Sequence, residues 1–221
     1  MSKSDDMKLS MAPYDLDDEL LARTRTTNTA QVRVLRWQGV AVVIGRGGKA
    51  ELELNASSIL ADGVPVLRRP GGGCSVVLDP GNLVVSVGLP MPGISNIKKG
   101  FAQISDWLID ALEHCGVPGV RQEGISDLTL GDLKIGGSCI YRTRNLLYYS
   151  TTLLVQPDLD QVSRYLSHPP REPDYRRGRC HRDFMASLAG LGLADDADAL
   201  AVCLERRLVA GLDELANNTG C

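Results

Sequence analysis

Two short segments carry residues whose types and spacing suit the binding of an anion. The first runs from Arg68 to Cys74 and consists of two arginines, a proline, three glycines and a cysteine. Backbone N–H groups of residues without a Cβ can approach an anion closely, and arginine binds a phosphate or carboxylate through two parallel hydrogen bonds. The segment suits a nucleotide or an acyl-adenylate, although a flexible turn between strands would have the same composition. It is not a Walker loop, because no Gly-Lys-Ser/Thr follows.

The second segment, Asp132 to Cys139, places a lone cation, Lys134, in an otherwise apolar strand just before two glycines. A lysine ammonium is a compact point charge that can stabilise negative charge developing on phosphate or carboxylate oxygens. A lysine that faces solvent from a half-buried strand would fit the pattern equally well. Asp127 is also open to two interpretations, a carboxylate at a strand edge or a ligand for a magnesium ion or an adenosine.

The overall composition favours one domain and disfavours several classes of protein. We expect a single domain over 1–221, because a chain of 221 residues with 43% apolar residues can build one proper core. A net charge of -3 gives no sign of nucleic-acid binding. Residues 1–11 contain no continuous apolar stretch, so we expect a mobile tail there, no signal peptide or membrane span, and a cytoplasmic protein.

The cysteines and histidines suggest neither disulfides nor a metal site. The six cysteines, at positions 74, 115, 139, 180, 203 and 221, form no Cys-x-x-Cys pair, so we expect reduced thiols. The three histidines, at 114, 168 and 181, are scattered, without a His-x-x-x-His or Cys/His cluster. Structural zinc is therefore not expected.

The elements that must position these residues begin with strands. Strands are predicted where β-branched and other apolar residues cluster, and the glycine-rich segment joins two of them. The predicted strands are Val32–Trp37, Val40–Ile44, Pro65–Arg69, Ser75–Leu78, Leu83–Leu89, Asp127–Leu130, Leu133–Tyr141 and Leu146–Val155.

Helices are predicted between these strands and after them. The clearest runs from near Ser95 to Gly116, where apolar residues such as Phe101, Ile104 and Leu108 line one face. The others are Tyr14–Thr24, a short helix capped by Asn55 and ended by Gly63, Asp158–Leu166, and helices within His181–Leu191 and Asp198–Leu212. Strand runs with packed helices, and no alternating βαβ series, predict an α+β fold with mixed or antiparallel sheets.

In combination, these segments resemble the catalytic domain of lipoate-protein ligases, in the biotin/lipoate A/B protein ligase family. The resemblance covers Tyr14 to Leu188, where the matching segments follow the family's order and approximate spacing. They are Trp37 with 42–46, Glu53-Leu54-Asn55, Arg68-Arg69 with Gly71-Gly72-Gly73, Gly81-Asn82, Ser126-Asp127-Leu128, and Lys134-Ile135-Gly136-Gly137-Ser138. The resemblance is to the form without the family's large C-terminal accessory domain, which would begin near the end of this chain.

The resemblance implies roles for particular residues. In the family the glycine loop and its arginine hold the acyl-adenylate, and the strand lysine contacts the carboxylate and the phosphate. Lys134 is therefore expected to be catalytic. Contacts with substrate or adenylate are expected for Arg69, Gly71, Gly72, Gly73, Cys74, Asn82, Asp127, Ser138 and Cys139, while Trp37 and the strand around Leu153 should border an apolar lipoyl tunnel.

The implied reaction uses ATP, Mg²⁺ and lipoate. Lipoate is converted to lipoyl-AMP with loss of pyrophosphate, and a lysine of a carrier protein then attacks the mixed anhydride. Magnesium would be held through the phosphates, with Asp127 as a candidate ligand. The implied partner is a lipoyl domain, a glycine cleavage H-like protein or a sulfur-oxidation lipoate-binding protein, and some relatives need a separate accessory subunit. The basic run Arg171 to Arg182 could receive an acidic carrier surface or be a solvated loop.

Departures from the family pattern keep alternatives open. Pro70, Cys74 and Cys139 stand where serine, alanine and alanine are common, and Ser150 stands where many members have histidine, which leaves the acyl chain and the carrier undecided. An octanoyltransferase of the same fold would transfer octanoyl from acyl carrier protein through a cysteine thioester without ATP. Cys74 or Cys139 could serve as that nucleophile, although a small core cysteine is the simpler interpretation. A non-catalytic lipoate-binding regulator is a further alternative, disfavoured by the presence of both Arg69 and Lys134.

Overall fold

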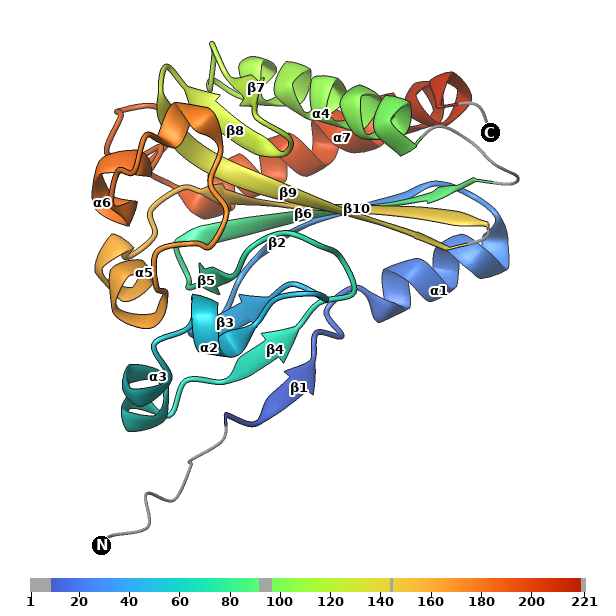
Figure 1. Ribbon diagram of the computed structural model, residues 1–221. Helices are drawn as coiled ribbons and strands as arrows, with labels where there is room; N and C mark the ends of the chain where they lie inside the picture. Colours follow the sequence, from blue (N-terminus) through green and yellow to red (C-terminus); the bar gives the residue numbers. More distant parts are fainter. Residues whose placement is uncertain (1–8, 92–96, 144, 220–221) are drawn as a thin grey trace, which may run out of the picture.

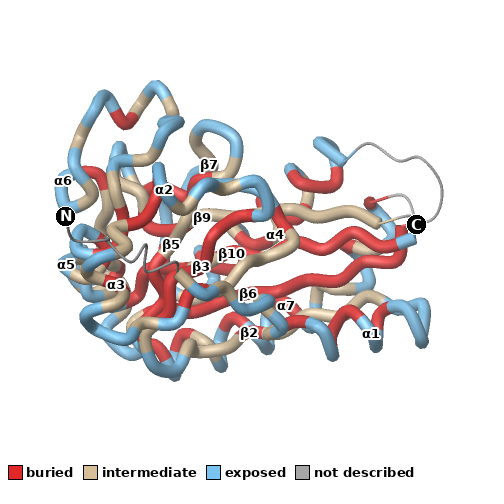
Figure 2. Tube along the Cα trace, turned by 60° about the horizontal axis from the view of Figure 1, so that its bottom comes forward, coloured by how far each residue is buried: buried red, intermediate tan, exposed pale blue. Residues whose placement is uncertain are grey.

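The computed structural model describes residues 9–91, 97–143 and 145–219 and is built on a six-stranded antiparallel sheet (Figure 1). In spatial order its strands are β2 (Gln31–Arg36), β6 (Asn82–Pro90), β10 (Leu146–Leu154), β9 (Leu133–Thr143), β8 (Asp127–Leu130) and β7 (Arg121–Glu123). β6 is buried along its whole length and lies with β10 in the buried centre of the molecule (Figure 2). Its run of valines and leucines fits a strand covered on both faces.

A smaller, mixed sheet packs against one face of the large sheet. Its strands, in spatial order, are β1 (Met11–Pro13), β4 (Val66–Arg68), β3 (Ala41–Ile44) and β5 (Val76–Leu78). β4 runs parallel to both β1 and β3, and β5 is antiparallel to β3. Val43 and Leu78 of this sheet pack against Val84 of β6. The glycine-rich segment connects β4 to β5 and so lies at the edge of this contact.

Two long helices, α4 (Ile97–His114) and α7 (Ala197–Asn218), cover the other face of the large sheet (Figure 1). Their apolar residues recur every three or four positions, which turns one side of each helix to the sheet. Ile104, Leu204 and Leu208 are completely buried in the resulting core. The side chain of Asp196 caps α7 by accepting hydrogen bonds from the backbone N–H groups of the first turn.

The remaining helices are shorter. α1 (Asp18–Thr27) lies on the same side of the large sheet as the small sheet, and the buried Asp17 before it accepts hydrogen bonds from Arg33, at 2.6 Å, and from the Tyr148 hydroxyl. The others gather at one end of the molecule (Figure 1): α2 (Ala50–Glu53), α3 (Ala56–Asp62), α5 (Leu159–Tyr165), the 3-10 helix η1 (Asp174–Arg176) and α6 (His181–Phe184). None of the described helices is both long and apolar enough to span a membrane.

The predicted α+β class and all eight predicted strands are confirmed, with ends shifted by up to two residues. Four short elements, β1, β7, α2 and η1, were not predicted, because three or four residues are too few to show a periodic pattern. Met11, the last residue of the expected tail, begins β1. The expected start of the long helix near Ser95 lies outside the described residues.

Three predicted helices differ in detail, each because of a long-range contact. The first helix begins at Asp18 and not at Tyr14, since the Tyr14 N–H continues the β1 pairing by donating to Arg68 O at 3.0 Å. The helix predicted within His181–Leu191 ends at Phe184, because the Ala186 N–H donates to Lys134 O at 2.9 Å and the chain joins the sheet. Asn55 precedes α3 as predicted, but its side chain bonds the end of α5 instead of capping.

Candidate functional site

The glycine-rich segment forms a loop whose shape is held by the arginine before it. The Arg69 guanidinium donates hydrogen bonds to Gly72 O at 2.9 Å and Cys74 O at 2.7 Å, and also to Val43 O at 3.2 Å. Gly73 has a φ of +91°, a conformation that favours glycine. Arg69, expected to bind an anion, is thus engaged with the loop's carbonyl groups and supplies positive charge beside it.

The loop also lies directly on the large sheet. A Cβ added to Gly71 would be 2.8 Å from Cys139 Sγ on β9, so this position requires glycine. The far end of the loop is fixed by the buried Glu53, whose Oε2 accepts hydrogen bonds from the Ser75 N–H and hydroxyl, both at 2.8 Å. The family segment around Glu53 therefore acts here by positioning the loop.

Lys134 and Asp127 meet on adjacent strands of the large sheet. Lys134 Nζ lies 2.6 Å from Asp127 Oδ1, and the two side chains are 24% and 12% exposed. A bulge in the pairing of β8 with β9, between Leu128 and Thr129, lies between these two residues in the ladder. A Cβ on Gly137 would come within 3.1 Å of Lys134 Nζ, so this glycine leaves the room in which the ammonium lies.

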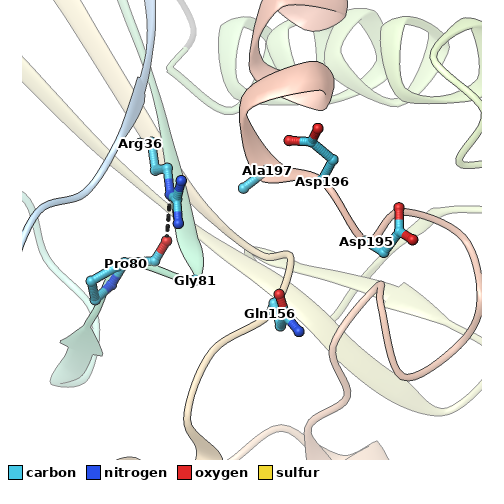
Figure 3. A pocket seen from close by; sticks show the side chains of 7 residues that line it. All are labelled: Arg36, Pro80, Gly81, Gln156, Asp195, Asp196 and Ala197. Atoms are coloured by element: carbon cyan, nitrogen blue, oxygen red, sulfur yellow. Dashed lines mark hydrogen bonds between the residues drawn. The ribbon is translucent and has the colours of Figure 1, made fainter.

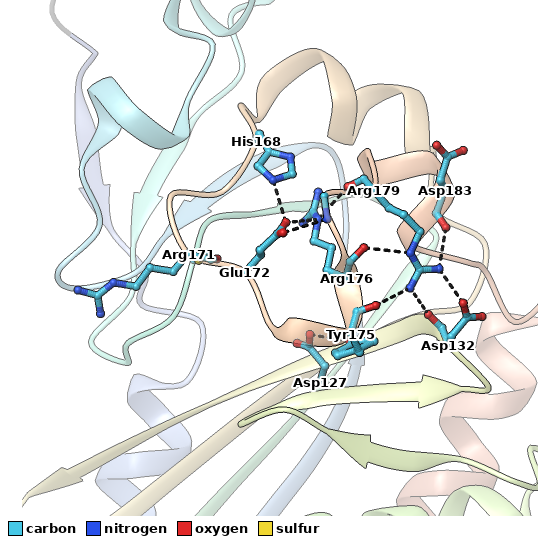
Figure 4. Close-up of polar contacts among 11 residues, drawn as sticks. Asp127, Asp132, His168, Arg171, Glu172, Tyr175, Arg176, Arg179 and Asp183 are labelled. Carbon is cyan, nitrogen blue, oxygen red and sulfur yellow. Dashed lines mark hydrogen bonds and ion pairs between the residues drawn. The ribbon is translucent and has the colours of Figure 1, made fainter.

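A segment of the chain closes over Asp127 from outside the sheet (Figure 4). We call residues 168–180 the strap. Tyr175 in the strap donates a hydrogen bond from its hydroxyl to Asp127 Oδ2 at 2.8 Å, and burial raises the pKa of this tyrosine. The strap is anchored further by Arg179, which binds Asp132 Oδ2 at 3.0 Å and Asp132 O at 2.8 Å. Sequence reasoning missed Tyr175, and an aromatic residue inside an arginine-rich run was its only signal.

The basic run does not form one basic surface. Arg176 is only 4% exposed and lies over the Phe184 ring, with its Cζ 4.7 Å from the ring centroid, and Arg179 faces the β8–β9 hairpin. Arg177 and Arg182 are exposed, and Arg182 pairs with Asp160. The expected acidic carrier surface could therefore meet only part of this run.

An apolar cluster between the two sheets borders the glycine loop. Trp37 stacks on Tyr14 with ring centroids 6.2 Å apart, and both pack with Val43, Leu78 and Val84. The role of Trp37 at the border of an apolar lipoyl tunnel stays a prediction. The side chain of Leu153 does not border this cluster, because it points to the opposite face of β10 and is buried under α4 and α7.

Two other expected contact residues have their side chains directed elsewhere. The Ser138 hydroxyl hydrogen-bonds Tyr149 at 2.8 Å and Thr151 at 3.0 Å, on the face covered by the helices, so its backbone alone is available to the site. Asn82 is fully buried, and its Oδ1 accepts from the Asp79 N–H at 2.7 Å. Its amide thus shapes the turn before β6, and none of its described contacts reaches Lys134 or the glycine loop.

The cysteines differ from the expectation in one respect. Cys115, in the turn directly after α4, and Cys203 of α7 form a disulfide, which contradicts the expected reduced state of all six thiols. The two residues are 88 positions apart, a separation at which no local pattern indicates pairing. Cys74 and Cys139 are free, and burial raises the pKa of both thiols.

A polar pocket lies apart from these residues, where the chain enters α7 (Figure 3). It has a volume of about 450 Å³ and is lined by Arg36, Pro80, Gly81, Gln156, Asp195, Asp196 and Ala197. None of the residues expected to bind substrate lines it. Its carboxylates make it unsuited to a phosphate.

The residues that the structure does bring together combine positive charge with apolar surface. The Lys134 ammonium and the Arg69-supported glycine loop lie on one face of β9, and the apolar cluster around Trp37 is on the same side of the sheet. Within the described ranges, no group of three or more His, Cys, Asp or Glu side chains could hold a metal ion. The chemistry offered is electrostatic stabilisation of a negatively charged group.

Comparison with known proteins shows to which family the chain is similar. Residues 11–201 match the family model described as the lipoyl protein ligase A/B catalytic domain. The chain is 29% identical to lipoate–protein ligase 1 of Staphylococcus aureus over 130 residues, which are 59% of this chain and 39% of that protein. It spans no more than half the length of the curated relatives it matches.

Two solved structures share the fold at low sequence identity. A bi-partite lipoate protein ligase of Thermoplasma acidophilum, described with its E2 lipoyl domain, has a TM-score of 0.74 at 21% identity, covering 95% of this chain and 89% of that one. A lipoate-protein ligase A bound with ATP has a TM-score of 0.73 at 21% identity, covering 95% and 91%.

Proposed function

The chain belongs to the lipoyl protein ligase A/B catalytic-domain family, and we propose that it is an ATP-dependent lipoate-protein ligase, which forms lipoyl-AMP and transfers the lipoyl group to a lysine of a lipoyl carrier protein. The observation that carries the proposal is the position of the Lys134 ammonium, which lies over Gly137 on the β9 face that also contacts the glycine loop. This arrangement suits a carboxylate and a phosphate that react with each other.

In the first step the lipoate carboxylate attacks the α-phosphorus of ATP, and pyrophosphate leaves. Lys134 stabilises the negative charge on the reacting oxygens, while the loop at Gly71, Gly72 and Gly73 offers backbone N–H groups to the phosphate. Arg69 keeps the loop in shape through its bonds to Gly72 O and Cys74 O. Asp127, which holds Lys134, keeps its bond to Tyr175 when the ammonium turns to the phosphate.

The lipoyl chain is assigned to the apolar cluster between the sheets. Trp37 and Tyr14 lie there, close to the glycine loop, and offer the apolar surface that an acyl chain needs. Cys139 borders the same region through its contact with Gly71.

Magnesium suits this site as an ion held by the phosphates of ATP more than as an ion held by protein side chains. Both carboxylate oxygens of Asp127 are already bonded, to Lys134 at 2.6 Å and to the Tyr175 hydroxyl at 2.8 Å. Mg²⁺ commonly keeps several waters and is held mainly by substrate phosphates. In this role it would offset the charge of the phosphates.

The second step transfers the lipoyl group to a carrier. The lysine amine of the carrier attacks the carbonyl carbon of the mixed anhydride, and AMP leaves with the electron pair of the broken C–O bond. A lipoyl domain is the expected carrier, since the similar Thermoplasma acidophilum ligase is described with an E2 lipoyl domain. The exposed Arg171 of the same basic run is available to an acidic carrier surface.

The thiols at the site do not support the octanoyltransferase alternative. Burial raises the pKa of both Cys74 and Cys139 and so favours the neutral thiol, whereas a thioester mechanism needs a thiolate nucleophile. Cys74 Sγ instead lies 3.7 Å from Arg171 O in the strap.

Release of pyrophosphate from MgATP tests the proposed first step. We expect release that depends on added lipoate, accompanied by lipoyl-AMP that stays bound to the protein. A parallel reaction supplies octanoyl-acyl carrier protein without ATP. Acyl transfer in that reaction, with no lipoate-dependent release of pyrophosphate, would replace the ligase assignment by the transferase.

A further inference from the structure

Arg176 in the strap is a buried cation with an unused hydrogen-bond donor. Its Nε donates to Arg179 O at 2.9 Å and lies 3.5 Å from Glu172 Oε2. Its Nη2 is buried and has no hydrogen-bond partner among the described residues. Buried polar groups are nearly always hydrogen-bonded, and an unsatisfied charged donor costs more than a neutral one. The guanidinium is therefore incomplete without a further acceptor.

The counter-charge near Arg176 is largely committed to other groups. Glu172 accepts from His168 Nε2 at 2.9 Å and from the Gly178 N–H at 2.9 Å, besides its longer contact with Arg176 (Figure 4). The strap's other inward arginine, Arg179, is saturated by Asp132 and by backbone carbonyls. The described residues supply no further acceptor for Arg176, which makes a bound ligand a candidate for that role.

The surroundings indicate that this ligand is an anion next to Lys134. His181, just beyond the strap, has its pKa lowered to about 4 by burial and by the positive charge of the nearby Arg176 and Lys134. Cys74 of the glycine loop and Asp127 both influence Arg176 electrostatically. Arg176 thus lies within electrostatic reach of the glycine loop and of the Lys134–Asp127 pair. The strap that carries it also contacts both, through Arg171 O with Cys74 Sγ and through Tyr175 with Asp127.

We propose that Arg176 binds the β- and γ-phosphates of ATP, the part of the nucleotide that leaves as pyrophosphate. The inference rests on the proposed function, which places the α-phosphate at Lys134. A triphosphate extending from Lys134 under the strap brings its terminal phosphates to Arg176, whose planar fork suits two phosphate oxygens. A carboxylate on a carrier surface does not fit as well, because the guanidinium is only 4% exposed and its Nη2 is buried, out of reach of a folded protein.

The role of Arg176 follows from the movement of charge in the reaction. A bond forms between a lipoate carboxylate oxygen and the α-phosphorus, and the bond from that phosphorus to the oxygen bridging to the β-phosphorus breaks. The electron pair leaves on pyrophosphate, next to Arg176. A guanidinium keeps its proton throughout, so it offsets this charge without taking part in proton transfer.

Calorimetric titration of two adjacent variants tests the proposal. Arg176→Gln removes the buried guanidinium, and Arg177→Gln is the matched control, because it makes the same charge change at the exposed neighbour. Each variant is titrated with MgATP, AMP and inorganic pyrophosphate in the absence of lipoate. We expect Arg176→Gln to weaken MgATP and pyrophosphate by about 10- to 100-fold and AMP by less than about twofold. Arg177→Gln should bind all three like the wild type.

Two results would overturn the inference: equal losses for AMP and MgATP in Arg176→Gln, or identical affinities in the two variants. If Arg176→Gln does not fold, Arg176→Lys is titrated in its place. We expect a smaller loss of affinity, again confined to MgATP and pyrophosphate. Wild-type affinities of Arg176→Lys for these two ligands would overturn the proposal. Lipoyl-AMP formation by the wild type is measured separately. If it occurs while the variants bind alike, the inference alone fails. If it is absent while Arg176→Gln shows the selective loss, the ligase function fails and the phosphate site stands.

Discussion

On the face covered by α4 and α7, the large sheet is held by apolar packing, whereas the edge under the strap is held by charges and hydrogen bonds. Ile104, Leu204 and Leu208 are completely buried under the helices. Under the strap, the ordering contacts are those of Asp127 with Lys134 and Tyr175, and of Arg179 with Asp132.

This difference indicates that one region stabilises the fold and the other carries the groups that could contact a substrate. The helix-covered face buries hydrocarbon and adds a disulfide, and both stabilise the fold without offering groups to a substrate. The strap edge instead keeps cations close to each other, with the Arg176 Nη2 unsatisfied. Uncompensated charge lowers stability, and it is retained where an anionic ligand uses it. Changes on the two sides should therefore have separable effects.

The largest effect is expected for Lys134→Ala at the strap edge. Loss of one preorganised electrostatic group lowers a rate by roughly 10²- to 10³-fold, and we expect that decrease in lipoate-dependent pyrophosphate release. Some stability should be lost as well, because the Asp127 carboxylate is only 12% exposed and keeps only its hydrogen bond from Tyr175. Thermal melting provides the control for folding. Release of pyrophosphate at a near wild-type rate would remove Lys134 from the catalytic site.

On the helix-covered face, loss of the Cys115–Cys203 disulfide should reduce stability alone. The disulfide joins residues that are 88 positions apart in the chain. Loss of such a link typically lowers the free energy of unfolding by about 2–4 kcal/mol. We expect the double variant Cys115→Ser/Cys203→Ser to show this decrease in urea denaturation, with unchanged lipoyl-AMP formation. Cys180→Ser, at an exposed free cysteine, is the control. Thiol labelling of both residues in the native, unreduced wild type would show that they are not paired.

His181 provides a smaller effect that depends on pH. Its pKa is lowered from 6.5 to about 4 by burial and by the positive charge of the nearby Arg176 and Lys134. Between these two values the unfolded chain binds a proton that the folded chain does not, so the free energy of unfolding decreases as pH falls through this window. After allowance for solvent screening, the change is about 1–2 kcal/mol. His181→Gln should flatten the stability profile between pH 6.5 and 4, and an unaltered slope in urea titrations would contradict the assigned environment.

The smallest effects are expected at the free thiols near the site. Cys74→Ser and Cys139→Ser, singly and together, should retain most of the ligase activity, because the proposed reaction activates the acyl group as an anhydride with AMP and not as a thioester. Losses should be those of a packing change around a small side chain. ATP-independent octanoyl transfer that disappears in either variant would instead make that cysteine a nucleophile.

The two regions also differ in how well the sequence predicts them. The helical period of Phe101, Ile104 and Leu108 is a local property, so α4 and the face it covers follow from the sequence. The glycine loop and Lys134 can also be recognised from the local sequence, because three consecutive glycines and a lone lysine in an apolar strand stand out by composition. The role of the strap cannot be predicted from its local sequence, because Tyr175 and Arg179 contact Asp127 and Asp132, which are over 40 residues away in the chain.

Side-chain direction was the other feature that composition could not supply. Ser138 and Cys139 are neighbours on β9, yet the Ser138 hydroxyl faces the helices and Cys139 faces the glycine loop. The alternation of a strand places them on opposite faces, but which face carries the site depends on how the whole sheet is covered.

The mass of a carrier protein after reaction decides between the ligase and its alternatives. A purified lipoyl domain is incubated with this protein, MgATP and lipoate, and its intact mass is then measured, together with a variant of the domain in which the target lysine is replaced by arginine. We predict a gain equal to one lipoyl group on the unmodified domain, none on the lysine variant, and none when ATP is omitted. An unchanged mass in the complete reaction would contradict the proposed function.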